Sequence, residues 1–297
     1  MKRFLLIIVL SWVILPQIKS DKLICRRVKS LNILSQATDI IENSTLENGF
    51  VSMLKLKTLM VEVCVNESDE VKTEIISYLE DIARFDISVH KRKAALYGIK
   101  ELFPYLSSDM RVGIADYFCQ HCKITENFVN VMRPYSSIEL LPVERIGEGV
   151  EAVAAFIPQL NQDEIKLLNK ELVEEVALYC ARSMLSSRVQ DLSKIIRFLD
   201  SDAQSMTIKV LMDNFSDEED RAYKEDIGID VTACIVDNMS NFSSEVLNEI
   251  YEFVGGMLMS PDEVVRGIGV GIGTGLLDFI SDSDRKRQLK LFLSLAS

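Results

Sequence analysis

The sequence predicts an all-α fold of stacked antiparallel helical hairpins, and three observations support this prediction. From Ile24 to the C-terminus, apolar residues recur at spacings of three and four, the period of one face of a helix. The alternating apolar and polar runs that are typical of strands are nearly missing. Connections between the helical segments are mostly two to five residues long, which places successive helices side by side and antiparallel.

The helical segments fill the chain after its N-terminal stretch. Their expected ranges are 24–41, 50–65, 69–84, 88–106, 109–122, 143–158, 162–184, 187–199, 202–214, 217–239, 244–258, 261–280 and 284–295. The least regular stretch is Arg133–Gly149, which contains two prolines and two glycines. It is either a boundary between two helical halves or a bend in one continuous domain over residues 21–297.

Several junctions carry helix-start signals. In a capping box, the side chains at the N-cap and at N3 reciprocally satisfy exposed backbone donors. Three pairs fit this pattern: Asn161 with Glu164, Ser216 with Glu219, and Ser260 with Glu263. Pro261 is expected at the first helical position, where its missing N–H costs nothing.

Residues 1–20 have the pattern of a secretory signal peptide. Two basic residues precede twelve uncharged, largely apolar residues that end before Pro16, and the small residue Ser20 stands before Asp21. A bilayer span needs about 20 apolar residues, so this run is short for a retained anchor, which is the alternative. We therefore expect a secreted or periplasmic protein with no stable membrane span once the signal is removed.

The balance of charge restricts the class of partner. The N-terminal segment holds three of the 33 basic residues and none of the 45 acidic ones, so the remainder carries a net charge of −15. Such a field repels phosphate backbones and anionic lipid surfaces. The longest basic block is Arg285-Lys286-Arg287, which is too short to reverse the field locally. We expect no nucleic-acid binding.

The interpretation of the cysteines and of the asparagine triplets depends on the expected compartment. Six cysteines permit up to three disulfides in an oxidising compartment, although buried free thiols are the alternative. They are Cys25, Cys64, Cys119, Cys122, Cys180 and Cys234. Five asparagines stand in glycosylation triplets: Asn43, Asn66, Asn214, Asn238 and Asn241. Glycosylation in a eukaryotic secretory pathway would explain them. The alternative is that Asn and Ser share helix junctions because both cap well, and in a bacterial periplasm the triplets would carry no meaning.

The pair of cysteines in Cys119-Gln120-His121-Cys122 is the sharpest chemical motif. It falls near the end of an expected helix rather than at the N-terminus that lowers a thiol pKa. A zinc site would need two further ligands, and the chain has neither a second CxxC nor a spaced histidine pair. Packed or remotely bridged cysteines are the main interpretation, and a local disulfide, a metal site and redox catalysis are the alternatives.

Other candidate sites have ordinary structural explanations. Of the two histidines, His90 lies in a basic helix start, and no catalytic, phosphate-loop or EF-hand motif occurs. Ser216-Asp217-Glu218-Glu219-Asp220 contains calcium-type ligands, but acids in a first helical turn also complement the helix dipole. We therefore predict no catalytic, cofactor-binding or metal-binding residue.

Glycines alternate along one late segment, at Gly267, Gly269, Gly271, Gly273 and Gly275. Each costs roughly 1 kcal/mol relative to alanine in a helix. Glycines four apart, as at 267, 271 and 275, let another helix approach closely. A local break or strand and a membrane-inserting segment are the alternatives, and the uncharged span is only eleven residues long.

Two segments resemble the second helix of a HEAT-type repeat. They are Arg92-Lys93-Ala94-Ala95-Leu96-Tyr97-Gly98-Ile99-Lys100-Glu101-Leu102, and Pro261-Asp262-Glu263-Val264-Val265-Arg266 followed by Gly269 and Leu276-Leu277. Arg188 marks a fainter third case. The separations of 96 and 78 residues between these arginines fit units of about 40 to 48 residues. The intermediate segments lack the Val-Arg pair, and Lys91 stands where valine is usual.

The expected helices make about six pairs, enough to stack a continuous core as an α-solenoid. The resemblance to HEAT and armadillo repeats implies an elongated, curved surface for binding another macromolecule. We therefore expect a protein–protein interaction module or scaffold, not an enzyme, whose partner is another protein. A secreted helical enzyme and a host-interaction or virulence factor are the alternative hypotheses.

Overall fold

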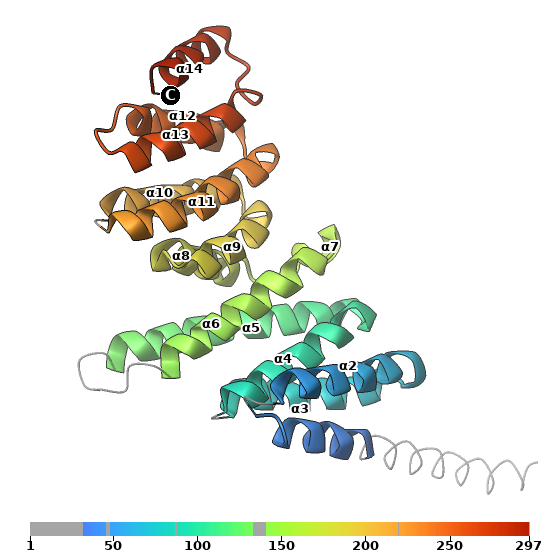
Figure 1. The fold of residues 1–297 in the computed structure, drawn as a ribbon. Helices are drawn as coiled ribbons and strands as arrows, with labels where there is room; N and C mark the ends of the chain where they lie inside the picture. Colours follow the sequence, from blue (N-terminus) through green and yellow to red (C-terminus); the bar gives the residue numbers. More distant parts are fainter. Residues whose placement is uncertain (1–31, 46–47, 87, 133–140, 219, 297) are drawn as a thin grey trace, which may run out of the picture. The chain divides into compact units, whose positions relative to one another are not determined.

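A computed structural model describes residues 32–45, 48–86, 88–132, 141–218 and 220–296 (Figure 1). Within these ranges all regular structure is helical, and no strand occurs. The all-α prediction is therefore confirmed. The chain divides into two compact units, one ending at Met110 and the other beginning at Arg111. The expected signal at residues 1–20, and Cys25, lie outside the described residues.

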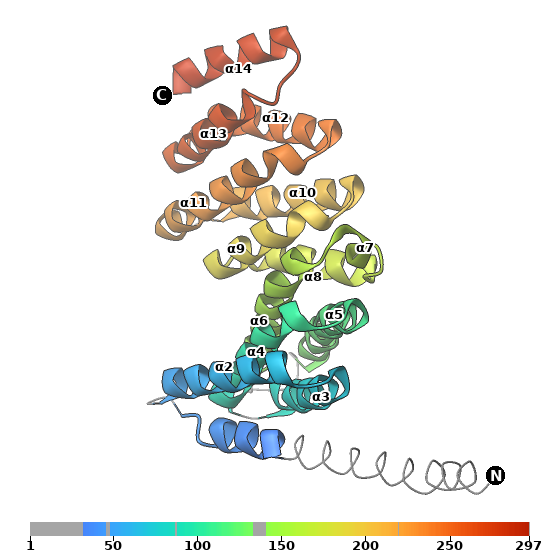
Figure 2. The same cartoon turned by 90° about the vertical axis from the view of Figure 1, so that its right-hand side faces the viewer.

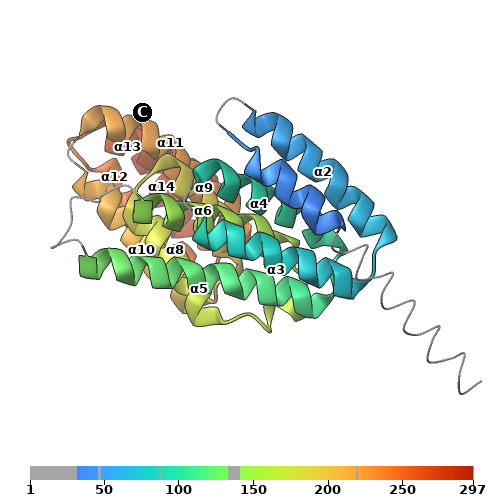
Figure 3. The same cartoon turned by 90° about the horizontal axis from the view of Figure 1, so that it is seen from below.

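The first unit is built around α4 (Val89–Leu102). Residues 32–42 are helical, and α2 (Gly49–Asn66) and α3 (Asp69–Phe85) follow. Helix α4 packs against both α2 and α3 and lies between them in Figure 3. It ends in a short 3₁₀ helix, η1 (Phe103–Tyr105).

The second unit contains most of α5 (Ser108–Met132) and all later elements. These are α6 (Leu141–Phe156), η2 (Ile157–Gln159), α7 (Gln162–Ile165), α8 (Lys170–Ser183), α9 (Ser186–Ile195), η3 (Ile196–Phe198), α10 (Ser201–Asp217), α11 (Arg221–Asn238), η4 (Met239–Asn241), α12 (Ser244–Leu258), α13 (Glu263–Leu276) and α14 (Ser283–Ala296).

Two rows of helices run through the second unit. Helices α8, α10, α12 and α14 contact one another in that order, and so do α6, α9, α11 and α13. The rows are joined by contacts such as α8 with α9 and α12 with α13, and Figure 2 shows this layering. Gly271 packs on Thr232 and Gly275 on Val236, so neighbours within a row are about 40 residues apart in sequence.

The same turn recurs after four helices, α4, α6, α9 and α11. Each runs into a three-residue 3₁₀ helix whose first residue is fully buried: Phe103, Ile157, Ile196 and Met239. The residue directly after the 3₁₀ helix is Leu or Phe, and its backbone N–H donates to the carbonyl of the buried first residue. These donors are Leu106 at 3.3 Å, Leu160 at 3.1 Å, Leu199 at 3.2 Å and Phe242 at 3.3 Å. A Ser, Asn or Asp follows, at Ser107, Asn161, Asp200 and Ser243. The last three cap the next helix through their side chains.

Most predicted helices differ from the observed ones by a few residues at their ends, and two differ more strongly. The range 162–184 contains two helices, α7 and α8, because the chain turns between them and the Asn169 backbone N–H donates to the Asp116 carboxylate at 2.9 Å. The helix expected over 109–122 continues to Met132 as α5. Cys119 and Cys122 therefore lie in the middle of a long helix and not near its end.

One of the three predicted capping boxes is confirmed. Asn161 accepts from the Glu164 backbone N–H, and the Glu164 carboxylate accepts from the Asn161 backbone N–H. The other two predictions are wrong because an aspartate further along the chain takes each cap. Asp220 caps α11 and Asp262 caps α13, so Ser216 stays within α10 and Pro261 precedes the cap instead of opening the helix.

Part of the irregular stretch Arg133–Gly149 is helical. Residues 133–140 lie outside the described residues, and 141–149 form the start of α6. Gly147 is buried there, and a Cβ at this position would lie 2.8 Å from a guanidinium nitrogen of Arg188. A bend or boundary in this stretch stays a prediction.

Candidate functional site

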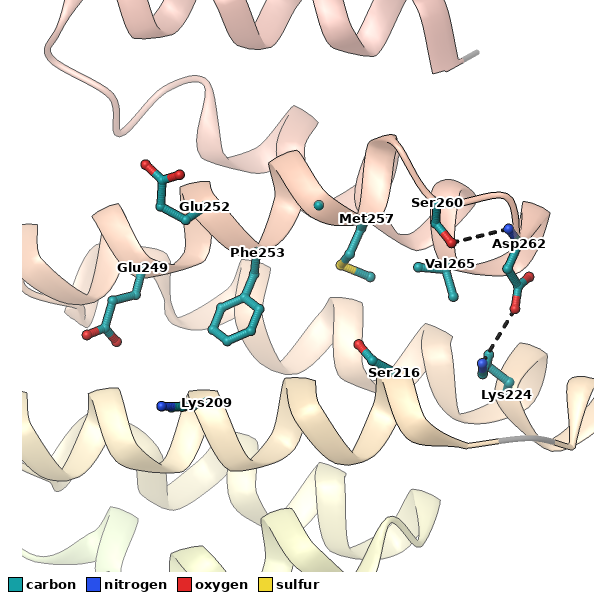
Figure 4. A pocket seen from close by; sticks show the side chains of 11 residues that line it. Lys209, Ser216, Lys224, Glu249, Glu252, Phe253, Met257, Ser260, Asp262 and Val265 are labelled. Atoms are coloured by element: carbon teal, nitrogen blue, oxygen red, sulfur yellow. Dashed lines mark hydrogen bonds and ion pairs between the residues drawn. The ribbon is translucent and has the colours of Figure 1, made fainter.

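A groove of about 650 Å³ opens between α10 and α12 in the second unit (Figure 4). We call it the α10–α12 groove. Residues of α10 and α12 form its two sides, and the starts of α11 and α13 close one end. The groove forms between these two helices because they are parallel neighbours in one row. The Ser205 hydroxyl on α10 donates a hydrogen bond to the Glu249 carboxylate on α12 at 2.6 Å.

Three apolar side chains form the floor of the α10–α12 groove. Phe253 and Met257 lie one turn apart on α12, and Val265 lies on α13. Met257 and Val265 are buried, whereas Phe253 is half-buried and points from α12 toward α10 in Figure 4. The floor can therefore cover an apolar side chain that enters from solvent.

A buried lysine closes one end of the groove. Lys224 is only 6 % exposed, and its Nζ lies 3.4 Å from Oδ2 of Asp262. Asp262 also accepts from the Val264 backbone N–H at 2.9 Å, as the cap of α13. Burial opposes ionisation of Asp262, but the backbone hydrogen bonds and Lys224 outweigh it and lower the pKa of its carboxyl. The end of the groove is thus a fixed ion pair.

The remaining charges lie on the rim and face solvent. Glu249 and Glu252 project from α12, and Lys209 lies across from Glu249 on α10 (Figure 4). Glu249 accepts from Ser205, whereas Lys209 and Glu252 have no ion-pair partner among the described residues. The rim can therefore pair with a ligand that carries both signs of charge.

Gly256 keeps the groove open. It lines the groove on α12, and a Cβ placed there would meet no atom within 4 Å. The neighbouring Gly255 has the same free space but is not among the groove-lining residues. A larger side chain at Gly256 would occupy the groove without disturbing the core.

The groove lining combines apolar and charged side chains. The residues that line the groove include no cysteine and no histidine. Elsewhere in the described ranges, no cluster of three or more His, Cys, Asp or Glu side chains is arranged to hold a metal ion. The groove's volume falls in the usual range for ligand sites, roughly 300 to 1,000 Å³.

The described cysteines are free thiols. Cys119 and Cys122 on α5, Cys180 on α8 and Cys234 on α11 are buried, and Cys64 on α2 is partly exposed. None of these five forms a disulfide with another. Burial raises the pKa of each of the four buried thiols, to about 12 at Cys234, so these four are poor nucleophiles at neutral pH.

The remaining predicted sites separate in the structure. His90 is half-buried at the start of α4, and the side chain of His121 lies outside the described residues. In the acidic run, Ser216 and Asp217 end α10 while Asp220 caps α11, whose first turn contains no acid. The expectation of acids in that first turn is therefore wrong.

The glycines of α13 face three neighbouring helices, and Gly273 packs against Val254 of α12 and Leu293 of α14. Gly269 packs against Met257 and Leu258 of α12, whereas Gly271 and Gly275 pack against α11. Gly267 has no atom within 4 Å of a Cβ. Close helix approach is confirmed at 271 and 275, but the predicted set of 267, 271 and 275 is wrong at its first member.

The glycosylation triplets differ in accessibility. Asn43, Asn66 and Asn241 are exposed, and Asn214 is half-buried with its amide donating to the Ala181 carbonyl at 3.3 Å. Asn238 is only 3 % exposed. Its Nδ2 donates to the Ser193 carbonyl at 3.0 Å and to the Cys234 carbonyl at 2.9 Å.

Two of the three marked arginines make the same local contact. Arg92 donates to the carbonyl of Asp86 at 3.0 Å, and Arg266 donates to that of Ser260 at 2.9 Å. In both cases the acceptor lies six residues earlier, in the turn before the helix. Arg188 instead pairs with Asp191 at 2.7 Å within α9.

Sequence reasoning missed the groove and the recurring turn. The adjacent pair Gly255-Gly256 inside an otherwise amphipathic helix was a usable signal for an open position. The turn leaves a weaker one, a Leu or Phe followed by Ser, Asn or Asp after a buried apolar residue. Its four copies are separated by 54, 39 and 43 residues, too irregular to stand out.

Comparison with known proteins found no family model and no curated protein that matches this chain. In the ranges that the structure describes, no helix has both the length and the apolar character that a membrane span requires.

Proposed function

We propose that this chain is a HEAT-like α-solenoid that works as an extracytoplasmic protein-binding module. Three observations support the solenoid: the two rows of helices, the offset of about 40 residues between neighbours in a row, and the turn that recurs after four helices. The shared contacts of Arg92 and Arg266 support equivalent positions in two repeats. The pattern of residues 1–20 supports the compartment.

The α10–α12 groove carries the functional part of the proposal. Its apolar floor and mixed-charge rim match the anatomy of protein interfaces, which have an apolar centre and a polar edge. Helices of one row form its sides, as expected for ligands that lie across successive repeats. The chain's net charge of −12 disfavours nucleic acid as the ligand.

The expected occupant is a peptide segment of another protein. An apolar side chain of the segment would cover Phe253 and Met257, a basic residue would face Glu252, and an acidic residue would face Lys209. Each rim pair is worth less than about 1 kcal/mol, so most of the affinity would come from the apolar anchor. The proposal includes no catalytic activity.

Selection from a random peptide library tests the groove. Peptides that bind the wild-type chain are expected to carry an apolar residue near a basic one, and to lose at least tenfold in affinity against Gly256→Leu. The matched control is Gly255→Leu on the same helix, which leaves the groove open and should bind as the wild type does. Equal binding to both variants would refute the assignment of the groove.

A further inference from the structure

Helix α2 in the first unit has two apolar faces. Its inner face contains Leu56, Leu59, Met60 and Val63, all buried. Its outer side chains are apolar as well but exposed: Val51 by 49 %, Leu54 by 46 %, Val61 by 44 % and Val65 by 75 %. A helix that is apolar all round is normally buried on all sides. The outer face of α2 therefore lacks a neighbour within the described chain.

The outer face follows a heptad pattern. Val51, Leu54, Thr58, Val61 and Val65 are separated by three, four, three and four residues. This is the a/d spacing of a helix that packs against another helix through a continuous seam. At 100° per residue these positions lie opposite Leu56 and Val63. We call these five residues the outer seam.

The charges beside the outer seam of one chain can pair with the same charges on a second copy. Lys55 and Glu62 flank the seam on the same side, are exposed, and have no ion-pair partner among the described residues. If a second α2 packs antiparallel about Thr58, Lys55 of one copy faces Glu62 of the other. Two-fold symmetry then repeats the same pair. Lys57, which would face Glu62 in a parallel pair, is already 3.2 Å from Glu101.

We propose that the outer seam binds a second copy of this chain, with the two α2 helices antiparallel. Of the possible occupants, a second copy is the one whose charges are known to match, because Lys55 and Glu62 supply both halves of each pair. Anionic lipid is disfavoured, because the chain carries a net charge of −12. The proposal is independent of the α10–α12 groove, which lies in the other unit.

Sedimentation equilibrium at rising protein concentration tests the proposal. All 297 residues are expressed, and the chain is used as the host processes it. We expect a monomer–dimer equilibrium in the wild type. In Leu54→Glu the dimer dissociation constant should be at least about a hundredfold higher, because the dimer would have to bury two carboxylates in the seam. Ile229→Glu, at a 73 % exposed apolar position on α11, is the matched control and should dimerise normally.

Charge exchange tests the arrangement of the two helices. Lys55→Glu and Glu62→Lys should each weaken the dimer about tenfold, and the double variant should restore it, because opposite charges would again face each other across the seam. Circular dichroism should show every variant folded, since both positions are exposed. A wild-type chain that stays monomeric at every concentration overturns the proposal. A dimer that is indifferent to both single charge changes overturns the antiparallel arrangement.

Discussion

Asn238 shows how a single buried amide decides whether a glycosylation triplet can be used. Its Nδ2 lies within 3.1 Å of three oxygen acceptors, two on Ser193 and one on Cys234, whereas Asn241 is exposed one turn later. A glycan on Asn238 would displace these bonds and insert a bulky polar group into the packed junction of α9 and α11. In a eukaryotic secretory host, we therefore expect a glycan on Asn241 and none on Asn238.

Mass spectrometry of the secreted, folded chain distinguishes the two asparagines. Asn241→Gln should leave the peptide that contains both asparagines without a glycan. A glycan that remains on Asn238 in this variant would contradict the structure.

Glu80 on α3 makes stability depend on pH. Burial, together with the charge of Asp81, raises the pKa of its carboxyl from 4.5 to about 7. Because the folded state holds this proton more tightly than the unfolded state, the associated stability is complete below about 4.5 and is lost as the pH rises through about 7. Glu80→Gln should raise the free energy of unfolding by about 1 to 2 kcal/mol above that pH, after allowance for solvent screening.

Chemical denaturation below and above the pKa of Glu80 measures the effect. Asp81→Asn removes only the neighbouring charge, so it should act less strongly than Glu80→Gln, because burial is the larger cause. If Glu80→Gln keeps the wild-type dependence on pH, Glu80 is not the responsible group.

At the scale of elements, two glycines of α13 differ in whether their packing requires the absence of a side chain. Gly267 has free space at the Cβ position, whereas a Cβ on Gly269 would lie 2.9 Å from Cβ of Met257 and 3.3 Å from the Leu258 backbone nitrogen. Gly267→Ala should stabilise the chain by about 0.5 to 1 kcal/mol through helix propensity. Gly269→Ala should destabilise it by about 1 to 3 kcal/mol, because the backbone cannot retreat as a flexible side chain can.

Thermal unfolding of these two variants gives opposite signs if α13 packs as described. Two stabilised variants would mean that α12 is further from α13 than the structure has it. Two destabilised variants would mean that Gly267 has a role outside the chain's own packing.

The sequence predicted the elements better than their ends. Apolar spacing is a local property, so the range 244–258 matches α12 residue for residue. Caps depend on which of several adjacent polar residues reaches the first turn, and Asp262 wins that competition over Ser260. The break between α7 and α8 was missed because its cause, Asp116, lies 53 residues away from Asn169.

At the scale of the whole molecule, the candidate site could not be predicted from local sequence patterns. The α10–α12 groove combines Lys209 with Phe253 and Val265, whose proximity follows from helix stacking at about 40-residue offsets. Net charge is a sum over the chain, so the expectation that anionic ligands are disfavoured needs only the composition and stays a prediction. The outer seam of α2 is intermediate, since its spacing is local but its exposure is known only once α3 and α4 are in place.

The compartment remains a prediction about the whole chain, and its one tryptophan makes it testable. Trp12 lies in the expected signal, so a chain processed before Asp21 contains tyrosine and phenylalanine but no indole. We expect the protein recovered outside the cytoplasm to emit as tyrosine alone, whereas the unprocessed chain adds tryptophan emission. Intact mass, which identifies the new N-terminus, is the control. Tryptophan emission from the exported chain would show that residues 1–20 are retained, and the alternative of an N-terminal anchor would then replace the cleaved signal.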